Sequence, residues 1–218
     1  MTALPISDPP STATIGGPGR ERILDEAAAR FLAQGYAETS LRQVAAGVGI
    51  KAGSLYYHFA SKDDLFTAVL AEGMRVMRVA FDEAAATVAA GDLEGEARLH
   101  RHVLAHLQTI YDNGPYTAVH VTAFRHAPEA VRAEIVPVRD AYESSWTELL
   151  ADLLGPGRSA RELTMLRLTL FGAMNASVDW FDAERGNLDE FAQIVTHQFW
   201  SGAAPTNDQP PSGQKGRS

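Results

Sequence analysis

Apolar residues recur at helical spacing through most of this chain. In residues 20–34, Ile23, Leu24, Ala27, Phe31 and Leu32 fall on one stripe that stops at Gly35, as in a helix that turns one face to a core. No segment shows a convincing alternation with a period of two residues, the pattern of half-buried strands. The sequence therefore predicts an all-α fold.

Capping and proline positions help to place the expected helices. Ser61, with Asp64 three residues later, resembles a capping box and starts the longest helix. Pro128 suits a first helical turn, whereas Pro137 lies inside a helical pattern and is expected to kink or break it. The expected helices span residues 20–34, 40–47, 51–59, 61–90, 95–112, 115–125, 128–154, 160–184 and 188–201.

Composition excludes several classes of protein. The chain of 218 residues has no cysteine, so disulfides, thiol catalysis and cysteine metal sites are impossible. No apolar run approaches the roughly 20 residues that span a bilayer, and the N-terminus lacks the basic and apolar parts of a signal peptide. We therefore expect a cytoplasmic protein without a membrane partner.

The net charge of −8 is unevenly distributed. Residues 19–62 hold six Lys or Arg and four Asp or Glu, a balance of +2. Residues 63–218 hold thirteen and twenty-two, a balance of −9, and Asp8 supplies the remaining −1. A mildly basic N-terminal part thus precedes an acidic body.

The segment "TSLRQVAAGVGIKAGSLYYHFASK" (39–62) predicts two short helices joined by a tight turn. Thr39 or Ser40 can cap the first, and Ser40 with Gln43 has capping-box spacing. Gly49 supplies the backbone freedom that the turn needs. The apolar positions that would join the two helices are Val44, Val48, Ile50 and Leu55. This is the pattern of a helix-turn-helix, which presents its second helix to the major groove of DNA.

The second short helix carries more aromatic and polar residues than one buried face can use. If Leu55 and Phe59 face inward, then Ser54, Tyr56, Tyr57 and His58 distribute around the rest of the helix. Tyrosine hydroxyls and histidine nitrogens can donate to phosphate, and a tyrosine ring can pack on a thymine methyl. The alternative is that Tyr56 or Tyr57 packs on the first short helix. The cations Arg42, Lys51 and Lys62 flank the set.

Residues 20–66, "RERILDEAAARFLAQGYAETSLRQVAAGVGIKAGSLYYHFASKDDLF", resemble the N-terminal domain of TetR/AcrR-type transcriptional regulators. The resemblance implies a homodimer that binds a palindromic DNA operator, usually as a repressor, and a small-molecule effector in a helical C-terminal domain. Carried over by position, Ser40 and Arg42 would contact phosphate. Tyr57, His58 and Lys62 would bind the DNA backbone. The residues placed near base edges would be Lys51, Ala52, Gly53, Ser54 and Tyr56.

These expectations divide the chain into four parts. Residues 1–18 and 203–218 are rich in Pro, Gly, Ser and Thr, and we expect both to be disordered tails because they hold little apolar surface. Residues 19–62 form the three-helix helix-turn-helix domain. Residues 63–202 form the larger helical ligand-binding and dimerisation domain.

The last two expected helices have broad apolar faces. Two such helices per subunit can form a four-helix interface with a second copy, although they can also simply close the core of one subunit. The expected interface residues are Leu163, Leu166, Leu170, Met174, Phe181, Phe191, Ile194 and Val195.

The C-terminal part resembles, less specifically, a subgroup of these regulators concerned with fatty-acid or steroid breakdown. The likeness rests on Gly172, Asn175, Trp180 and Phe181 in "LFGAMNASVDWFDAERGNLDEFAQIVTHQFW". It implies an effector that is small and apolar or amphipathic, such as an acyl-CoA thioester.

Polar and aromatic residues on otherwise apolar helix faces are candidates for the effector site, although each can also be an ordinary core or surface residue. Such sites are mostly apolar with a few orienting polar groups. The candidates are His102, His106, Tyr116, His120, Phe124, Trp146, Asn175 and Asp179.

Metal binding and catalysis are two alternative roles for the histidines. His102 and His106 lie four residues apart, with His100 nearby, but no HExxH pattern supplies further ligands. We expect no metal and no cofactor. An enzyme with histidine bases has no support from a G-x-S-x-G motif or a phosphate-binding glycine loop. A DNA-binding dimer whose body only dimerises remains open, and a cavity in the body would decide against it.

The expected mechanism couples the two domains. An effector in the body displaces the helices of residues 95–125. These push on the long helix that starts at Ser61, and the two DNA-reading helices of the dimer lose their spacing.

Overall fold

The computed structural model describes residues 18–112 and 114–204, and within them every regular element is a helix. The expected tails, residues 1–18 and 203–218, lie outside the described residues except for Pro18, Ala203 and Ala204. The elements are α1 (Pro18–Glu38), α2 (Leu41–Val48), α3 (Ala52–His58), α4 (Lys62–Gly91), α5 (Gly95–Asp112), α6 (Pro115–Ala123), η1 (Phe124–His126), α7 (Glu129–Leu154), α8 (Ala160–Asn175), η2 (Ala176–Asp179) and α9 (Leu188–Ala203).

The all-α prediction is confirmed, whereas a break at Pro137 is absent and the helix expected over residues 160–184 is shorter. Helix α7 runs unbroken through Pro137, whose ring lies on the exposed surface of the helix. Helix α8 stops at Asn175 and does not reach residue 184. There the Ser177 hydroxyl donates to the carbonyl of Met174 over 2.6 Å, and the chain continues as the 3-10 turn η2.

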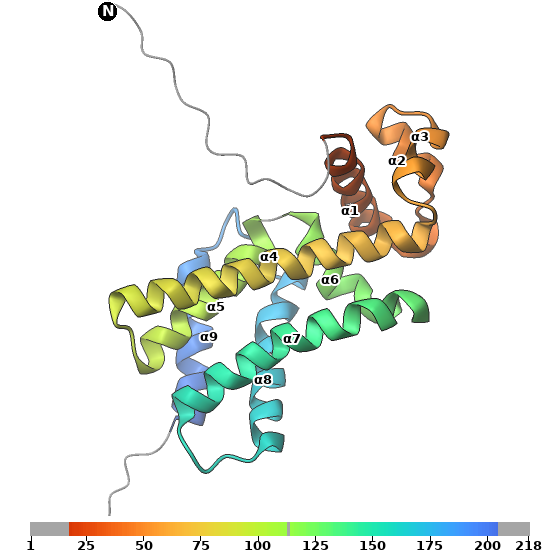
Figure 1. Ribbon diagram of the computed structural model, residues 1–218. Coiled ribbons are helices and arrows are strands. Elements are labelled where there is room, and N and C mark those ends of the chain that lie inside the picture. Colours follow the sequence, from red (N-terminus) through yellow and green to blue (C-terminus); the bar gives the residue numbers. More distant parts are fainter. Residues whose placement is uncertain (1–17, 113, 205–218) are drawn as a thin grey trace, which may run out of the picture.

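The α4 helix organises the molecule. Figure 1 shows α1, α2 and α3 gathered at one end of α4, which then runs the length of the body beside α5, α6 and α7. Helices α8 and α9 lie on the far side of α5 and α7 from α4. None of the described helices combines the length and apolar character needed to cross a membrane.

Two hydrophobic cores share α4. The first joins α1, α2 and α3 to Leu65, Phe66, Val69 and Leu70 of α4 and to buried residues of α6 and α7. The second begins at Met74 and Met77 of α4 and extends through α5, α7, α8 and α9. The N-terminal core therefore extends past residue 62, where the sequence placed the domain boundary.

Helix α6 crosses α4 where the two cores meet. A Cβ atom placed on Gly73 would lie 2.7 Å from the backbone oxygen of Tyr116, so only glycine permits this approach. The Tyr116 hydroxyl donates to Oδ1 of Asp25 in α1 over 2.7 Å. One helix thus contacts both the N-terminal domain and the body.

Candidate nucleic-acid interface and ligand cavity

Local capping fixes the geometry of α2. Ser40 accepts from the Gln43 backbone N–H over 3.3 Å, and the Gln43 side chain accepts from the Ser40 N–H over 2.7 Å. At the other end Gly49 has φ +74°, and the N–H of Ile50 donates to the Ala45 carbonyl over 2.9 Å. These are the bonds of a Schellman motif with glycine in the left-handed region. The capping box and glycine turn that the sequence predicted are both present.

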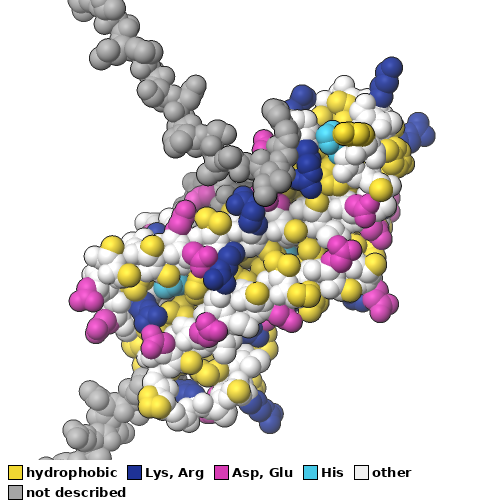
Figure 2. Space-filling view, in the orientation of Figure 1, with side chains coloured by type: hydrophobic (Ala, Val, Ile, Leu, Met, Phe, Trp, Pro, Cys, Tyr) yellow, Lys and Arg dark blue, Asp and Glu magenta, His cyan; other side chains and the backbone are white. Residues whose placement is uncertain are grey.

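Helix α3 keeps its apolar residues inward and its polar face free. Leu55 and Phe59 are buried, whereas Tyr56 is 53% and Tyr57 89% exposed. Tyr57 therefore does not pack on α2, and its ring contacts His58 edge-on at 5.4 Å. Figure 2 shows Lys and Arg side chains around hydrophobic and His side chains at this end of the molecule. The exposed face offers aromatic, hydroxyl and cationic groups to a partner.

The other predicted DNA contacts surround this face. Ser40, Arg42, Lys51, Gly53, Ser54 and His58 are exposed, and Ala52 is half-buried. A Cβ on Gly53 would meet nothing within 4 Å. Ten residues of the N-terminal domain were predicted to contact DNA, and nine of them lie on or beside α2 and α3.

The Lys62 side chain forms hydrogen bonds to other residues of the N-terminal domain. Its ammonium donates to the carbonyls of Tyr36 and Ala37 over 2.8 and 3.3 Å and lies 4.1 Å from the centre of the Tyr36 ring. The Tyr36 hydroxyl donates to Asp63, and burial followed by this bond raises the pKa of Tyr36 to about 12. Lys62 thus closes the C-terminal end of α1.

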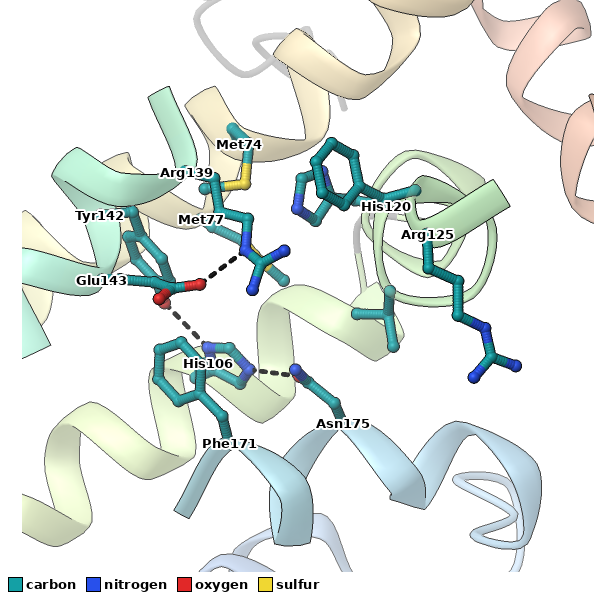
Figure 3. Close-up of a pocket in the computed structure, with 12 residues that line it drawn as sticks. Met74, Met77, His106, His120, Arg125, Arg139, Tyr142, Glu143, Phe171 and Asn175 are labelled. Carbon is teal, nitrogen blue, oxygen red and sulfur yellow. Dashed lines mark hydrogen bonds and ion pairs between the residues drawn. The ribbon is translucent and has the colours of Figure 1, made fainter. Parts of the chain in front are cut away.

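The body contains a cavity of about 160 Å³ between α4, α5, α6, α7 and α8. Figure 3 shows His106 between Tyr142 and Asn175, with Met74 and Met77 of α4 across from it. The lining residues are Met74, Met77, His106, His120, Val121, Phe124, Arg125, Arg139, Tyr142, Glu143, Phe171 and Asn175.

A wider groove of about 450 Å³ adjoins this cavity. It shares Val121, Arg125, Arg139, Phe171 and Asn175 with the cavity, and Asp179 belongs to the groove alone. Arg125 is exposed and Arg139 half-exposed. A molecule can thus lie with one end in the inner cavity and the other in the groove, beside two guanidinium groups.

His106 is the best-connected polar group of the cavity. Its Nδ1 lies 2.8 Å from the Tyr142 hydroxyl, and its Nε2 lies 3.0 Å from Oδ1 of Asn175. Because the amide oxygen only accepts, Nε2 carries the proton and Nδ1 accepts from Tyr142. Burial lowers the pKa of His106 from 6.5 to about 4, against the raising effect of the bond to Asn175. The ring is neutral at pH 7.

A buried ion network borders the same space. Glu143 accepts from Arg139 and from Arg167, each over 2.6 Å. The Arg139 guanidinium also lies 5.3 Å from the centre of the Phe124 ring. Two cations share one buried carboxylate, so the cavity mouth is electropositive.

His120 has unused hydrogen-bonding capacity at the cavity wall. It stacks on Phe124 at 5.2 Å, and its buried Nδ1 has no hydrogen-bond partner among the described residues. Burial, with the nearby charge of Arg139, lowers the pKa of His120 to about 4. A neutral imidazole here can donate or accept one hydrogen bond to a guest.

The structure brings together part of the predicted effector site. His106, His120, Phe124 and Asn175 line the cavity, and Asp179 lines the outer groove. His102 bonds the Arg98 carbonyl over 2.9 Å, Tyr116 bonds Asp25, and Trp146 is buried beside the cavity without lining it.

Several lining residues were missed by the sequence reasoning. Met74, Met77 and Phe171 read as ordinary core positions. Arg139 and Glu143 lie four apart and look like a surface ion pair. The signal available in the sequence was Tyr142. A tyrosine that becomes buried in a helix needs a hydrogen-bond partner for its hydroxyl, which indicates polar groups in that part of the core.

The predicted dimer residues divide between core and surface. Leu170, Met174 and Val195 are buried in the subunit, and Val195 also reaches the wall of an apolar groove on the outer side of α8 and α9. Leu163, Leu166 and Phe191 are half-buried against the second core. Phe181 is half-buried and stacks on Phe191 at 5.0 Å, and Ile194 is exposed. The large apolar side chains exposed on this side are Met165, Leu168, Trp180 and Ile194.

The histidines of α5 do not form a metal site. His100 pairs with Asp189 at 3.4 Å, while His102 and His106 use ring nitrogens for bonds within the protein. Among residues 18–112 and 114–204, no three His, Asp or Glu side chains are placed to hold a metal ion.

Family models match both halves of the chain. The model described as bacterial regulatory proteins, tetR family, matches residues 23–69. The model of the tetracyclin repressor-like C-terminal domain matches residues 92–201, half of the chain. The chain belongs to the TetR family. This is a family of transcriptional regulators and not of enzymes.

Curated relatives match over the N-terminal part. The HTH-type transcriptional repressor KstR2 of Mycobacterium tuberculosis is 45% identical over 51 residues, 23% of this chain and 26% of the relative. KstR2 of Rhodococcus jostii is 39% identical over 66 residues, 30% of this chain and 32% of the relative. These alignments span about a quarter to a third of the relatives' length.

Solved structures share the whole fold of this family member. The fatty acid degradation regulator FadR from Bacillus halodurans has a TM-score of 0.70 at 21% identity, covering 87% of this chain and 98% of that one. AibR, solved with isovaleryl coenzyme A and operator DNA, has a TM-score of 0.69 at 18% identity, covering 84% and 98%.

Proposed function

We propose that this TetR-family protein is a homodimeric cytoplasmic repressor that binds a palindromic operator and is released by a small amphipathic effector. The observation that carries the proposal is the free face of α3. A tyrosine that is 89% exposed has no role in the core, whereas ring and hydroxyl suit a DNA groove. The flanking cations Arg42 and Lys51 supply phosphate contacts.

The dimer is proposed on the outer side of α8 and α9. An apolar groove of about 630 Å³ lies there, with Trp180, Phe181, Phe191 and Ile194 in its walls. Exposed apolar groups gathered in one region indicate an interaction surface. A second copy pairs its own α8 and α9 with this surface, and two α3 helices then reach successive major grooves about 34–36 Å apart.

The effector class follows from the shape and charge of the cavity and groove. The cavity combines the apolar side chains of Met74, Met77, Val121, Phe124 and Phe171 with several polar groups, and Arg125 and Arg139 line both the cavity and the adjoining groove. An acyl-CoA thioester has this distribution, with an apolar acyl end and anionic phosphates. The complex of AibR with isovaleryl coenzyme A supports the same class.

Release of DNA is proposed to pass through α6. His120 and Val121 of α6 line the cavity, while Tyr116 of the same helix touches Gly73 of α4 and Asp25 of α1. An effector that displaces α6 therefore moves both helices that carry the DNA-binding domain. Such an effector shifts the equilibrium only if it binds the released form more tightly.

The test begins with capture of promoter fragments by the full chain from the genomic DNA of its source. A gel-shift titration of a captured fragment is then repeated with saturating acyl-CoA. We expect operator affinity to fall by at least about tenfold, a coupling of roughly 1.4 kcal/mol. Unchanged affinity, with calorimetry showing the ligand bound, would contradict effector-driven release. It would favour a body that only dimerises.

A further inference from the structure

One wall of the cavity is built from two methionines of α4. Met74 and Met77 are both buried, line the cavity and belong to the second core. In Figure 3 they lie opposite His106 and Phe171. They stand one turn apart on the helix that carries the DNA-binding domain at its other end.

The walls contributed by α5, α7 and α8 are held in place by other contacts. His106 is fixed by Tyr142 and Asn175, and Trp146 packs behind it with its ring 5.8 Å away. Glu143 is held by two arginines. A longer guest therefore cannot gain room on this side without breaking buried hydrogen bonds or ion pairs.

The volume sets a limit on the buried end of the guest. The cavity holds about 160 Å³, and an engineered apolar cavity of about 150 Å³ in another protein accommodates benzene. The space therefore suits about six non-hydrogen atoms. Methylene groups beyond that number must either displace Met77 into a packed core, which is unfavourable, or remain in the more open groove outside the cavity.

We propose that the buried end of the effector is a short acyl chain of up to about six non-hydrogen atoms, and that Met77 sets this limit. The inference rests on the proposed function, because it refines the effector class of the same cavity. It predicts an order of affinities opposite to that of a general apolar surface, on which longer chains bind more tightly.

The test is calorimetric binding of acetyl-, butyryl-, hexanoyl-, decanoyl- and palmitoyl-CoA to the full chain and its variants. We expect butyryl- or hexanoyl-CoA to bind most tightly, and palmitoyl-CoA at least about tenfold more weakly. Met77→Ala should move the optimum to decanoyl-CoA. Met174→Ala is the matched control, because Met174 is buried in the same core without lining the cavity. If Met77→Ala does not fold, Met77→Val removes less volume and should move the optimum in the same direction.

Each outcome decides the proposal. The proposal is overturned if the wild type binds palmitoyl-CoA as tightly as hexanoyl-CoA. It is also overturned if both Met77 variants keep the wild-type order of affinities, or if Met174→Ala shows the same shift as Met77→Ala. If no thioester binds any variant, the acyl-CoA class itself fails, and the length limit fails with it. Operator capture reports separately on the DNA-binding part of the proposed function.

Discussion

The two cores that share α4 bury different kinds of side chain. Around α1, α2 and α3 the core consists of aliphatic and aromatic groups, and Thr39, in the link between α1 and α2, is the buried polar residue among residues 19–62. The core of the body buries His102, His106, Tyr142 and Glu143. Contacts between apolar side chains are not directional, whereas each buried polar group requires a hydrogen-bond partner in a defined direction.

This difference separates two tasks. The first core holds α3 in place and leaves every recognition group on its outer face. The second core keeps its polar groups around an enclosed space, where a guest can exchange hydrogen bonds with them. The proposed binding of DNA therefore depends on an exposed surface, and the proposed binding of an effector on the interior.

Truncating the apolar core should give the largest effect. Phe31→Ala removes a fully buried ring and is expected to cost about 3–5 kcal/mol in the free energy of unfolding, measured with denaturant. The adjacent Leu32 is 43% exposed, so Leu32→Ala should change stability by less than about 1 kcal/mol. Equal losses in both variants would contradict the assigned inward face.

Lowering the pH should destabilise the core of the body. The pKa of His106 is about 4 in the folded protein against 6.5 as its ordinary value. Between these pH values the unfolded chain binds the proton and the folded one does not, so stability falls as pH is lowered from about 6.5 to about 4. The contribution of this group is about 3 kcal/mol.

The matched variants are His106→Gln and His58→Gln. We expect His106→Gln to weaken the dependence of unfolding free energy on pH by roughly half, because burial also lowers the pKa of His120 to about 4. His58→Gln, which alters an exposed ring, should preserve the dependence. A wild-type pH dependence in His106→Gln would show that other groups govern acid unfolding.

The salt dependence of operator binding distinguishes two lysines. Lys51 is exposed beside α3, so Lys51→Ala should lower the slope of log affinity against log salt by about one. Lys62 donates to carbonyls of α1, so Lys62→Ala should lower thermal stability and leave the slope near its wild-type value. A reduced slope in Lys62→Ala would support the contact between Lys62 and a DNA phosphate that the sequence predicted.

The smallest effect is expected at the contact between α6 and α1. Tyr116→Phe removes one half-exposed hydrogen bond to Asp25, a loss of about 1 kcal/mol or less. Operator affinity without effector should stay within about threefold, while the response to effector weakens. An unaltered response would place the coupling elsewhere, for instance at Gly73.

The N-terminal site was predictable because its signals are local. Ser40, Gln43 and Gly49 specify the caps and the turn within a few residues of one another. The inward apolar positions of α3 also determine which of its other residues are exposed. The cavity depends on side chains from five helices. Nothing near Met77 or Arg139 in the sequence says which neighbours they meet.

Helix faces in the C-terminal part were ambiguous for a related reason. Leu170 and Met174 point inward while Met165 and Leu168 point outward, yet all four are apolar and lie on one helix. An apolar helix between a core and a proposed dimer interface shows no polar side to set its rotation. The direction of each residue emerges only from the packing of α8 on the body.

The glycine at the crossing of α4 and α6 divides α4 into two unequal arms. From Gly73 to Lys62 the rise of about 1.5 Å per residue gives an arm of roughly 17 Å. A tilt of about ten degrees at Gly73 would shift the base of each DNA-binding domain by roughly 3 Å, close to the spacing of one base pair. In a symmetric dimer the two shifts add. A small rotation beside the cavity would thus be magnified into a misfit of a whole base-pair step at the DNA.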